Sequence, residues 1–158
     1  MRKTLLTALL ASFCAIVFSS AAALAADNWI GTWKLNTAKS RFKPGPAPKS
    51  LTLKWEATAD GVRHTSDGVG SDGNPTHGTY VTKYDGQDVP WEGNPDADMA
   101  SARKISANSY RNVWKKDGKT TITAKVVVSN KGKILTVTQV GKNAKGQAVN
   151  NRLVYDRQ

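Results

Sequence analysis

The stretch "DNWIGTWKLN" (residues 27–36) places two tryptophans in a segment whose pattern predicts a β-strand. Successive side chains of a strand point to opposite faces of the sheet, so residues of odd number share one face here. That face carries Trp29, Gly31, Trp33 and Leu35. Two indoles on one face indicate that it is buried, and the glycine between them lets the backbone bend. We therefore predict a first strand at 29–36 whose Trp33 enters the base of the core.

The same period-two alternation recurs along the chain, whereas no segment after residue 25 repeats apolar residues at helical spacing for three turns. The clearest case is "LTLKWEA" (residues 51–57), where Leu51, Leu53 and Trp55 alternate with polar residues. Such alternation indicates a sheet with one buried and one wet face. Asp-Gly pairs, which tolerate positive φ, predict hairpin turns at 60–61, 85–86 and 117–118. The predicted strands are 29–36, 50–59, 62–67, 76–84, 87–91, 99–106, 109–116, 119–129, 133–140 and 148–156.

Consecutive hairpins make a meander, and about ten strands are enough to close it on itself. Closure removes both sheet edges and needs only short connections in an up-and-down barrel. We therefore predict an all-β fold, an up-and-down antiparallel β-barrel of about ten strands. One connection is longer: "TAKSRFKPGPAPKS" (residues 37–50), whose prolines forbid a helix. We expect this segment either to be a plain linker or to cap one end of the barrel, with Phe42 as a plug.

The first 25 residues have the three blocks of a secretory signal peptide. Arg2 and Lys3 precede an apolar run over 5–18, and small residues end at Ala25. The run is shorter than the roughly 20 residues that span a bilayer, so we expect cleavage after Ala25 rather than a membrane anchor. The prediction is a signal peptide at 1–25 and one domain at 26–158, with no transmembrane segment in the mature chain. The only cysteine, Cys14, leaves with the signal, and a secreted chain without disulfides favours the bacterial periplasm or outer surface.

The chain is strongly basic, with 23 Lys and Arg against 12 Asp and Glu and a formal net charge of +11. Removal of residues 1–25 would take away only two of these charges. A basic surface attracts anions of every kind without choosing among them. The basic residues are scattered, with no run longer than Lys115-Lys116, which favours a solubilising surface. We expect weak contact with anionic envelope surfaces at most, and no nucleic-acid partner.

Two ends of the chain resemble the calycins, meaning the lipocalins and the intracellular fatty-acid-binding proteins. Gly31-Thr32-Trp33 opens the first strand as their G-x-W motif does, and "LVYDRQ" (residues 153–158) closes the chain in a similar way. The whole chain also resembles a group of small exported bacterial proteins without an assigned activity. The resemblance implies a calycin-like barrel with Trp33 under the cavity. As in lipocalins, a basic residue of the last strand, Arg152 or Arg157, would pack over it.

Two features depart from the fatty-acid-binding proteins. Their first two strands are joined by a pair of helices that form a lid, which the prolines of 37–50 forbid. Their last strand carries an inward arginine for a carboxylate, two residues before its tyrosine. Leu153 stands there, two residues before Tyr155, while Arg152 falls on the opposite face. The carboxylate clamp of that family therefore does not carry over.

Six residues are candidates for ligand binding. If Met99, Ser101, Arg103 and Ile105 face inward together, Arg103 needs an anionic partner, because an unpaired buried guanidinium is costly. If the inward and outward positions of this strand are exchanged, Arg103 is solvated. The aromatic residues at the apolar positions of their strands have two possible uses. They either line a pocket with their polar groups or only pack within the barrel wall. The candidates are Trp33, Trp55, Arg103, Tyr110, Trp114 and Tyr155.

Catalysis finds little support in the sequence. The two histidines, His64 and His77, are expected as surface or loop residues, and no spacing marks a metal site, a nucleophile elbow or a phosphate loop. The Asp- and Gly-rich loops 68–75 and 92–98 lack the ligand spacing of a calcium site and are expected to be ordinary turns. We predict no enzyme activity, no cofactor and no metal.

Two hypotheses of function remain. The first is an exported, non-enzymatic barrel that binds a small apolar or amphipathic ligand in its interior. The alternative is a barrel packed shut, which acts as a cell-envelope scaffold or interaction protein through its basic surface.

Overall fold

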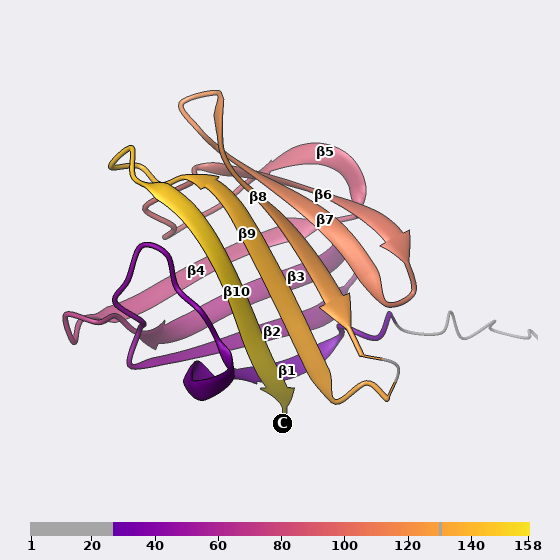
Figure 1. The fold of residues 1–158 in the computed structure, drawn as a ribbon. Coiled ribbons are helices and arrows are strands. Elements are labelled where there is room, and N and C mark those ends of the chain that lie inside the picture. The colour runs from indigo at the N-terminus through magenta and orange to yellow at the C-terminus, as the bar shows by residue number, and fades with distance from the viewer. Residues whose placement is uncertain (1–26, 130) are drawn as a thin grey trace, which may run out of the picture.

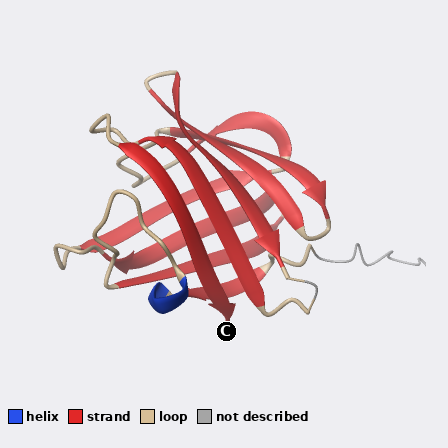
Figure 2. Ribbon diagram, viewed as in Figure 1, coloured by secondary structure: helices blue, strands red, loops and turns tan. Residues whose placement is uncertain are grey.

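The computed structural model describes residues 27–129 and 131–158, and the predicted signal peptide lies outside them. The regular structure of the described chain is antiparallel strand, apart from one short 3-10 helix (Figures 1 and 2). No helix in this part of the chain is long and apolar enough to cross a membrane. The elements are β1 (Gly31–Leu35), η1 (Thr37–Lys39), β2 (Ser50–Thr58), β3 (Gly61–Val69), β4 (Pro75–Thr82), β5 (Asp85–Pro90), β6 (Met99–Ser106), β7 (Ser109–Lys116), β8 (Lys119–Val128), β9 (Ile134–Lys142) and β10 (Ala148–Arg157).

The ten strands form one sheet in the order β4-β3-β2-β1-β10-β9-β8-β7-β6-β5. Neighbours along the chain are neighbours in this sheet, except that β1 joins β10 and that β4 and β5 are its two ends. The sheet curls until these ends meet (Figure 1). They are linked by one bridge, in which Thr79 and Glu92 exchange two N–H···O bonds of 3.0 Å. The predicted all-β, up-and-down barrel is confirmed, with a wall that is nearly closed between β4 and β5.

The base of the barrel is built as the first stretch of sequence predicts. Trp29 and Trp33 are 0% exposed, and the Trp33 indole N–H donates to the Trp29 carbonyl at 2.8 Å. The Arg157 guanidinium lies 4.6 Å from the centre of the Trp33 ring, and its Nη2 donates to the Ile30 carbonyl at 2.9 Å. Of the two basic residues expected over Trp33, it is therefore Arg157 that packs there.

Gly31 makes room for this arginine. Its φ is +129°, and a Cβ at this position would lie 3.3 Å from Arg157 Nη1. A side chain here would be strained by the backbone and crowded by the guanidinium. The G-x-W motif therefore places the indole and also leaves space for the arginine that covers it.

The segment between β1 and β2 is bound to the barrel, so it is not a plain linker. Arg41 exchanges two backbone hydrogen bonds with Arg152, at 2.8 and 2.9 Å, beyond the point where β1 ends beside β10. Phe42 is half-buried and packs against the main core, as expected for a capping residue. No helical lid forms between β1 and β2, where η1 spans only Thr37–Lys39.

Candidate ligand-binding cavity

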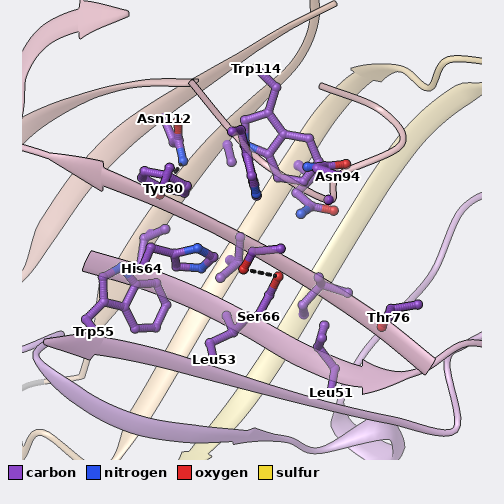
Figure 3. Close-up of a pocket in the computed structure, with 18 of the residues that line it drawn as sticks. Leu51, Leu53, Trp55, His64, Ser66, Thr76, Tyr80, Asn94, Asn112 and Trp114 are labelled. Atoms are coloured by element: carbon purple, nitrogen blue, oxygen red, sulfur yellow. Dashed lines mark hydrogen bonds between the residues drawn. The ribbon is translucent and has the colours of Figure 1, made fainter. Parts of the chain in front are cut away.

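An interior cavity of about 180 Å³ lies between the wall of β2–β4 and the wall of β7–β10 (Figure 3). Its sides are largely aromatic and aliphatic. At one end it reaches Thr76, Gly93 and Pro95, which are exposed, so the cavity approaches solvent beside the 93–95 loop. The other end stops at the aromatic layer above the base, where Tyr110 packs 5.1 Å from Trp29 and 6.4 Å from Trp55.

Strand register assembles one side of the cavity. Trp55 of β2 is directly opposite His64 of β3, and His64 is opposite Tyr80 of β4. Alternation points all three inward, where the His64 ring stacks on Tyr80 at 4.7 Å and meets the edge of Trp55 at 4.9 Å. Trp91 packs 4.8 Å from Tyr80 and 4.8 Å from Trp114, which joins this row to β7. Five aromatic rings thus make a continuous cluster around one side of the cavity.

His64 is neutral in this environment. It is 5% exposed, and burial lowers its pKa from 6.5 to about 3, because the charged imidazolium would lose its hydration in the interior. Its Nδ1 has no hydrogen-bond partner among the described residues. The expectation that His64 is a surface or loop residue is wrong. In "VRHTS" (residues 62–66) the inward positions hold Val62 but then the polar His64 and Ser66, so the alternation does not reveal the burial of His64.

The lining holds polar groups but no formal charge. Asn112 Nδ2 donates to Tyr80 Oη at 2.9 Å, and Asn112 Oδ1 is left without a partner among the described residues. The indole N–H groups of Trp55, Trp91 and Trp114 also lack partners there. Burial raises the pKa of the lining tyrosines, which stay protonated. No Asp, Glu, Lys or Arg of the described chain lines the cavity, although the exposed His77 borders it.

Four of the six candidate residues line this cavity and two do not. Trp55, Tyr110, Trp114 and Tyr155 come together from β2, β7 and β10. Trp33 lies outside the lining, in the base of the barrel.

Of the two orientations left open for Arg103, the structure has the solvated one, so Arg103 and Ile105 do not face the interior. Ala100 and Ala102 of β6 are buried, at 0% and 1% exposure, and Arg103 is exposed on the outer face. In the segment "MASARKIS" (residues 99–106), the odd-numbered and even-numbered residues differ little in hydrophobicity, so the alternation does not show which set faces inward. Small alanines take the inner positions because large rings, including Trp114 opposite Ala100, already occupy the interior.

Sequence reasoning missed His64, Tyr80, Trp91 and Asn112 as lining residues. Tyr80 and Trp91 lie within predicted strands. A large aromatic residue on the same face of a strand as its buried neighbours is the signal that could have identified both. Asn112 is inward because it faces Ala102 and Ala124 across β6 and β8, which no local pattern reveals.

The two histidines alternate onto opposite faces of the sheet, although both border the cavity. His77 is on the outer face, where its Nδ1 is 2.6 Å from Asp67 Oδ1 and both side chains are 61% exposed. They therefore do not meet a carboxylate together in a cleft, which is the arrangement that would favour an enzyme. Among the described residues, no group of three His, Cys, Asp or Glu is placed to hold a metal ion.

No protein-family model matches the sequence, and the comparison with curated proteins found no match. Among solved structures, the chain is similar to the zebrafish ileal bile acid-binding protein complexed with cholic acid. The identity is 10%, the match covers 83% of this chain and 99% of that chain, and the TM-score is 0.48. A functional proposal for this chain therefore depends on the chemistry of its own cavity.

Proposed function

We propose that this protein is an exported, non-catalytic binding protein that holds one small uncharged molecule, about the size of a single ring, inside its barrel. The observation that carries the proposal is the cavity of about 180 Å³, lined by aromatic side chains and free of charged residues in the described chain. Export is supported by the signal-peptide pattern of residues 1–25.

The size of the cavity limits the ligand. Sites for drug-sized molecules usually measure about 300–1,000 Å³, which is more than this barrel offers. An apolar protein cavity of about 150 Å³ is known to hold benzene. A single ring with one or two substituents therefore suits the available space, and a long acyl chain does not.

The polarity of the wall limits the ligand further. An ionised carboxylate or ammonium in a buried site costs several kcal/mol unless a charged partner meets it, and the lining supplies none. An amphipathic ligand with an ionised head is therefore disfavoured. The indole N–H groups of Trp55, Trp91 and Trp114 have no partner among the residues that the structure describes, so an oxygen atom on the ligand would complete their hydrogen bonding. Each such bond contributes about 0.5–1.5 kcal/mol.

The test compares three ring molecules of equal size by isothermal titration calorimetry: benzamide, benzoate and benzylammonium. We expect benzamide to bind and both ions to bind at least tenfold more weakly. Ala124→Leu fills the cavity from β8 and should abolish binding, whereas Thr123→Leu, on the outer face of the same strand, should leave it intact. Circular dichroism melts check that both variants fold.

Two results would count against the proposal. Equal binding by wild type and Ala124→Leu would place the ligand outside the cavity. Failure of every neutral ring to bind would favour the second function, a barrel packed shut that acts through its basic outer surface.

A further inference from the structure

The outer wall of the barrel carries a row of like charges. Arg103 of β6 is directly opposite Arg111 of β7, and Arg111 is opposite Lys125 of β8. All three are exposed, and none forms an ion pair with a residue that the structure describes. Like charges directly opposite one another destabilise a sheet. On β5 the residue directly opposite Arg103 is the exposed Asp85, which forms no ion pair with Arg103 among the described residues. The like charges that face one another are therefore those of Arg103, Arg111 and Lys125, and a bound anion would relieve their repulsion.

The row continues across the next strands. Lys125 is opposite Thr138 of β9, which is opposite Arg152 of β10, and Arg152 bridges to Arg41. The cations thus follow one line across the wall, perpendicular to the strands.

A hollow of about 230 Å³ lies at one end of this row. It is lined by Arg103 and Arg111, with Gly86, Ser101 and Val113. Gly86 has a φ of +87°, and a Cβ there would lie 2.6 Å from Arg103 Nη2. The glycine of β5 thus leaves the space that the guanidinium occupies. Two guanidinium groups and a hydroxyl beside one hollow suit a phosphate oxyanion, which arginine binds through paired N–H groups.

Exposed aliphatic residues flank the cations on the same face. The large hydrophobic side chains that are exposed in the described chain are Ile105 (58%), Val127 (38%) and Val140 (54%). They lie on β6, β8 and β9. Val127 and Val140 are two residues from Lys125 and Thr138, so alternation puts them on the outer face as well. Ile105 lies at the register shift between Lys104 and Ser106, two residues from Arg103, and its side chain is the most exposed of the three. Ile105 and Val127 lie on one side of the row and Val140 on the other. Cations between exposed aliphatic side chains are typical of a surface that meets lipid headgroups and the upper acyl region.

We propose that the outer face of β6–β9, here called the docking wall, binds an anionic phospholipid surface and that the Arg103–Arg111 hollow receives a headgroup phosphate. The docking wall lies on the opposite side of the sheet from the interior cavity, so this inference does not depend on the interior ligand.

The test measures co-sedimentation of the purified protein with vesicles of phosphatidylcholine alone or mixed with phosphatidylglycerol. We expect binding to the anionic vesicles only. Each cation near an anionic membrane surface contributes about fivefold to binding. Removal of two cations by Arg103→Gln and Arg111→Gln should therefore lower the partition coefficient for the anionic vesicles about 25-fold. The matched control Arg63→Gln with Lys83→Gln makes the same charge change at exposed residues of β3 and the end of β4, and should lower it less than threefold.

A second pair of measurements separates a lipid surface from a soluble phosphate compound. Ile105→Ser with Val140→Thr keeps every charge and should weaken vesicle binding several-fold. Inorganic phosphate, followed by the NMR signals of the arginine Nε–H groups, should bind only at millimolar concentrations. Equal vesicle binding by the Arg103/Arg111 and control variants would overturn the proposal. So would the same partitioning to both lipid mixtures, full binding by the aliphatic variant, or micromolar phosphate binding without vesicles.

Discussion

At the scale of single residues, the cavity depends on a histidine that is buried without charge. His64 contributes an aromatic ring to the cluster with Trp55 and Tyr80, and its burial has a free-energy consequence that depends on pH. The unfolded chain binds a proton at His64 below pH 6.5, whereas the folded protein resists protonation until about pH 3. The stabilisation from a neutral His64 is therefore complete above pH 6.5 and is lost as the pH falls toward 3.

We predict that replacing His64 removes part of the acid sensitivity of the protein. Between pH 6 and 4 the wild-type free energy of unfolding should fall with pH more steeply than that of His64→Gln, by up to about 1.4 kcal/mol per pH unit. Urea denaturation at a series of pH values measures this difference. His77→Gln, at the exposed histidine of β4, is the matched control substitution. Parallel slopes for wild type and His64→Gln would contradict the assignment.

Gly31 provides a second prediction at this scale. Gly31→Ala should destabilise the protein by about 1–3 kcal/mol, because alanine at a φ of +129° is strained and its methyl group would crowd Arg157. Gly118→Ala is the comparison, since Gly118 has a φ of +73° in a hairpin with no atom within 4 Å of an added Cβ. In chemical denaturation, Gly118→Ala should lower the free energy of unfolding less than Gly31→Ala does. An equal decrease for the two variants would mean that Arg157 moves aside without an energetic cost.

At the scale of elements, the weakest part of the barrel is the seam between β4 and β5. The other neighbouring strands share ladders of paired residues, whereas this seam is held by the Thr79–Glu92 bridge. β5 also carries a register shift between Asp85 and Asp88, which bends it away from a continuous ladder. The cavity reaches solvent near the same bridge, at Gly93 and its neighbours. The seam and the cavity entrance therefore lie together.

We predict that Glu92→Pro opens this seam, because proline cannot donate the N–H that Thr79 accepts. The expected loss is about 1–3 kcal/mol of stability, with faster amide exchange at Thr79 and unchanged exchange in β8 and β9. Glu92→Ala keeps the N–H and serves as the control. Uniformly faster exchange over the whole sheet would show instead that the bridge supports global stability.

At the scale of the whole molecule, the sheet separates two chemistries. Its inner face surrounds an uncharged aromatic cavity, and its outer face on β6–β9 carries the cationic row and exposed aliphatic residues. Because one residue points in and the next points out, β6 buries Ala102 inside while it presents Arg103 outside.

We predict that an interior ligand stabilises the protein as a whole. At a free concentration of one hundred times its Kd, benzamide should raise the free energy of unfolding by about 2.7 kcal/mol. The shift should be the same for wild type and for the Arg103→Gln/Arg111→Gln variant, and absent for Ala124→Leu. Thermal melts measured by circular dichroism provide the comparison. Loss of the shift in the arginine variant would contradict the separation of the two faces.

The sequence by itself determined where the strands run and what closes the base. Alternation and Asp-Gly turns are local properties, so the ten strands were predictable within a few residues, and the two indoles around Gly31 specified a buried face. The hairpin predicted at 85–86 is wrong, because Asp85 and Gly86 lie in β5, and β4 and β5 are the two ends of the sheet rather than paired neighbours. Tertiary structure alone decided the orientation of β6, the burial of His64 and the size of the cavity. Those features depend on which side chains from distant strands already fill the interior, as at Ala100 opposite Trp114, and that competition for volume leaves no periodic signal in the chain.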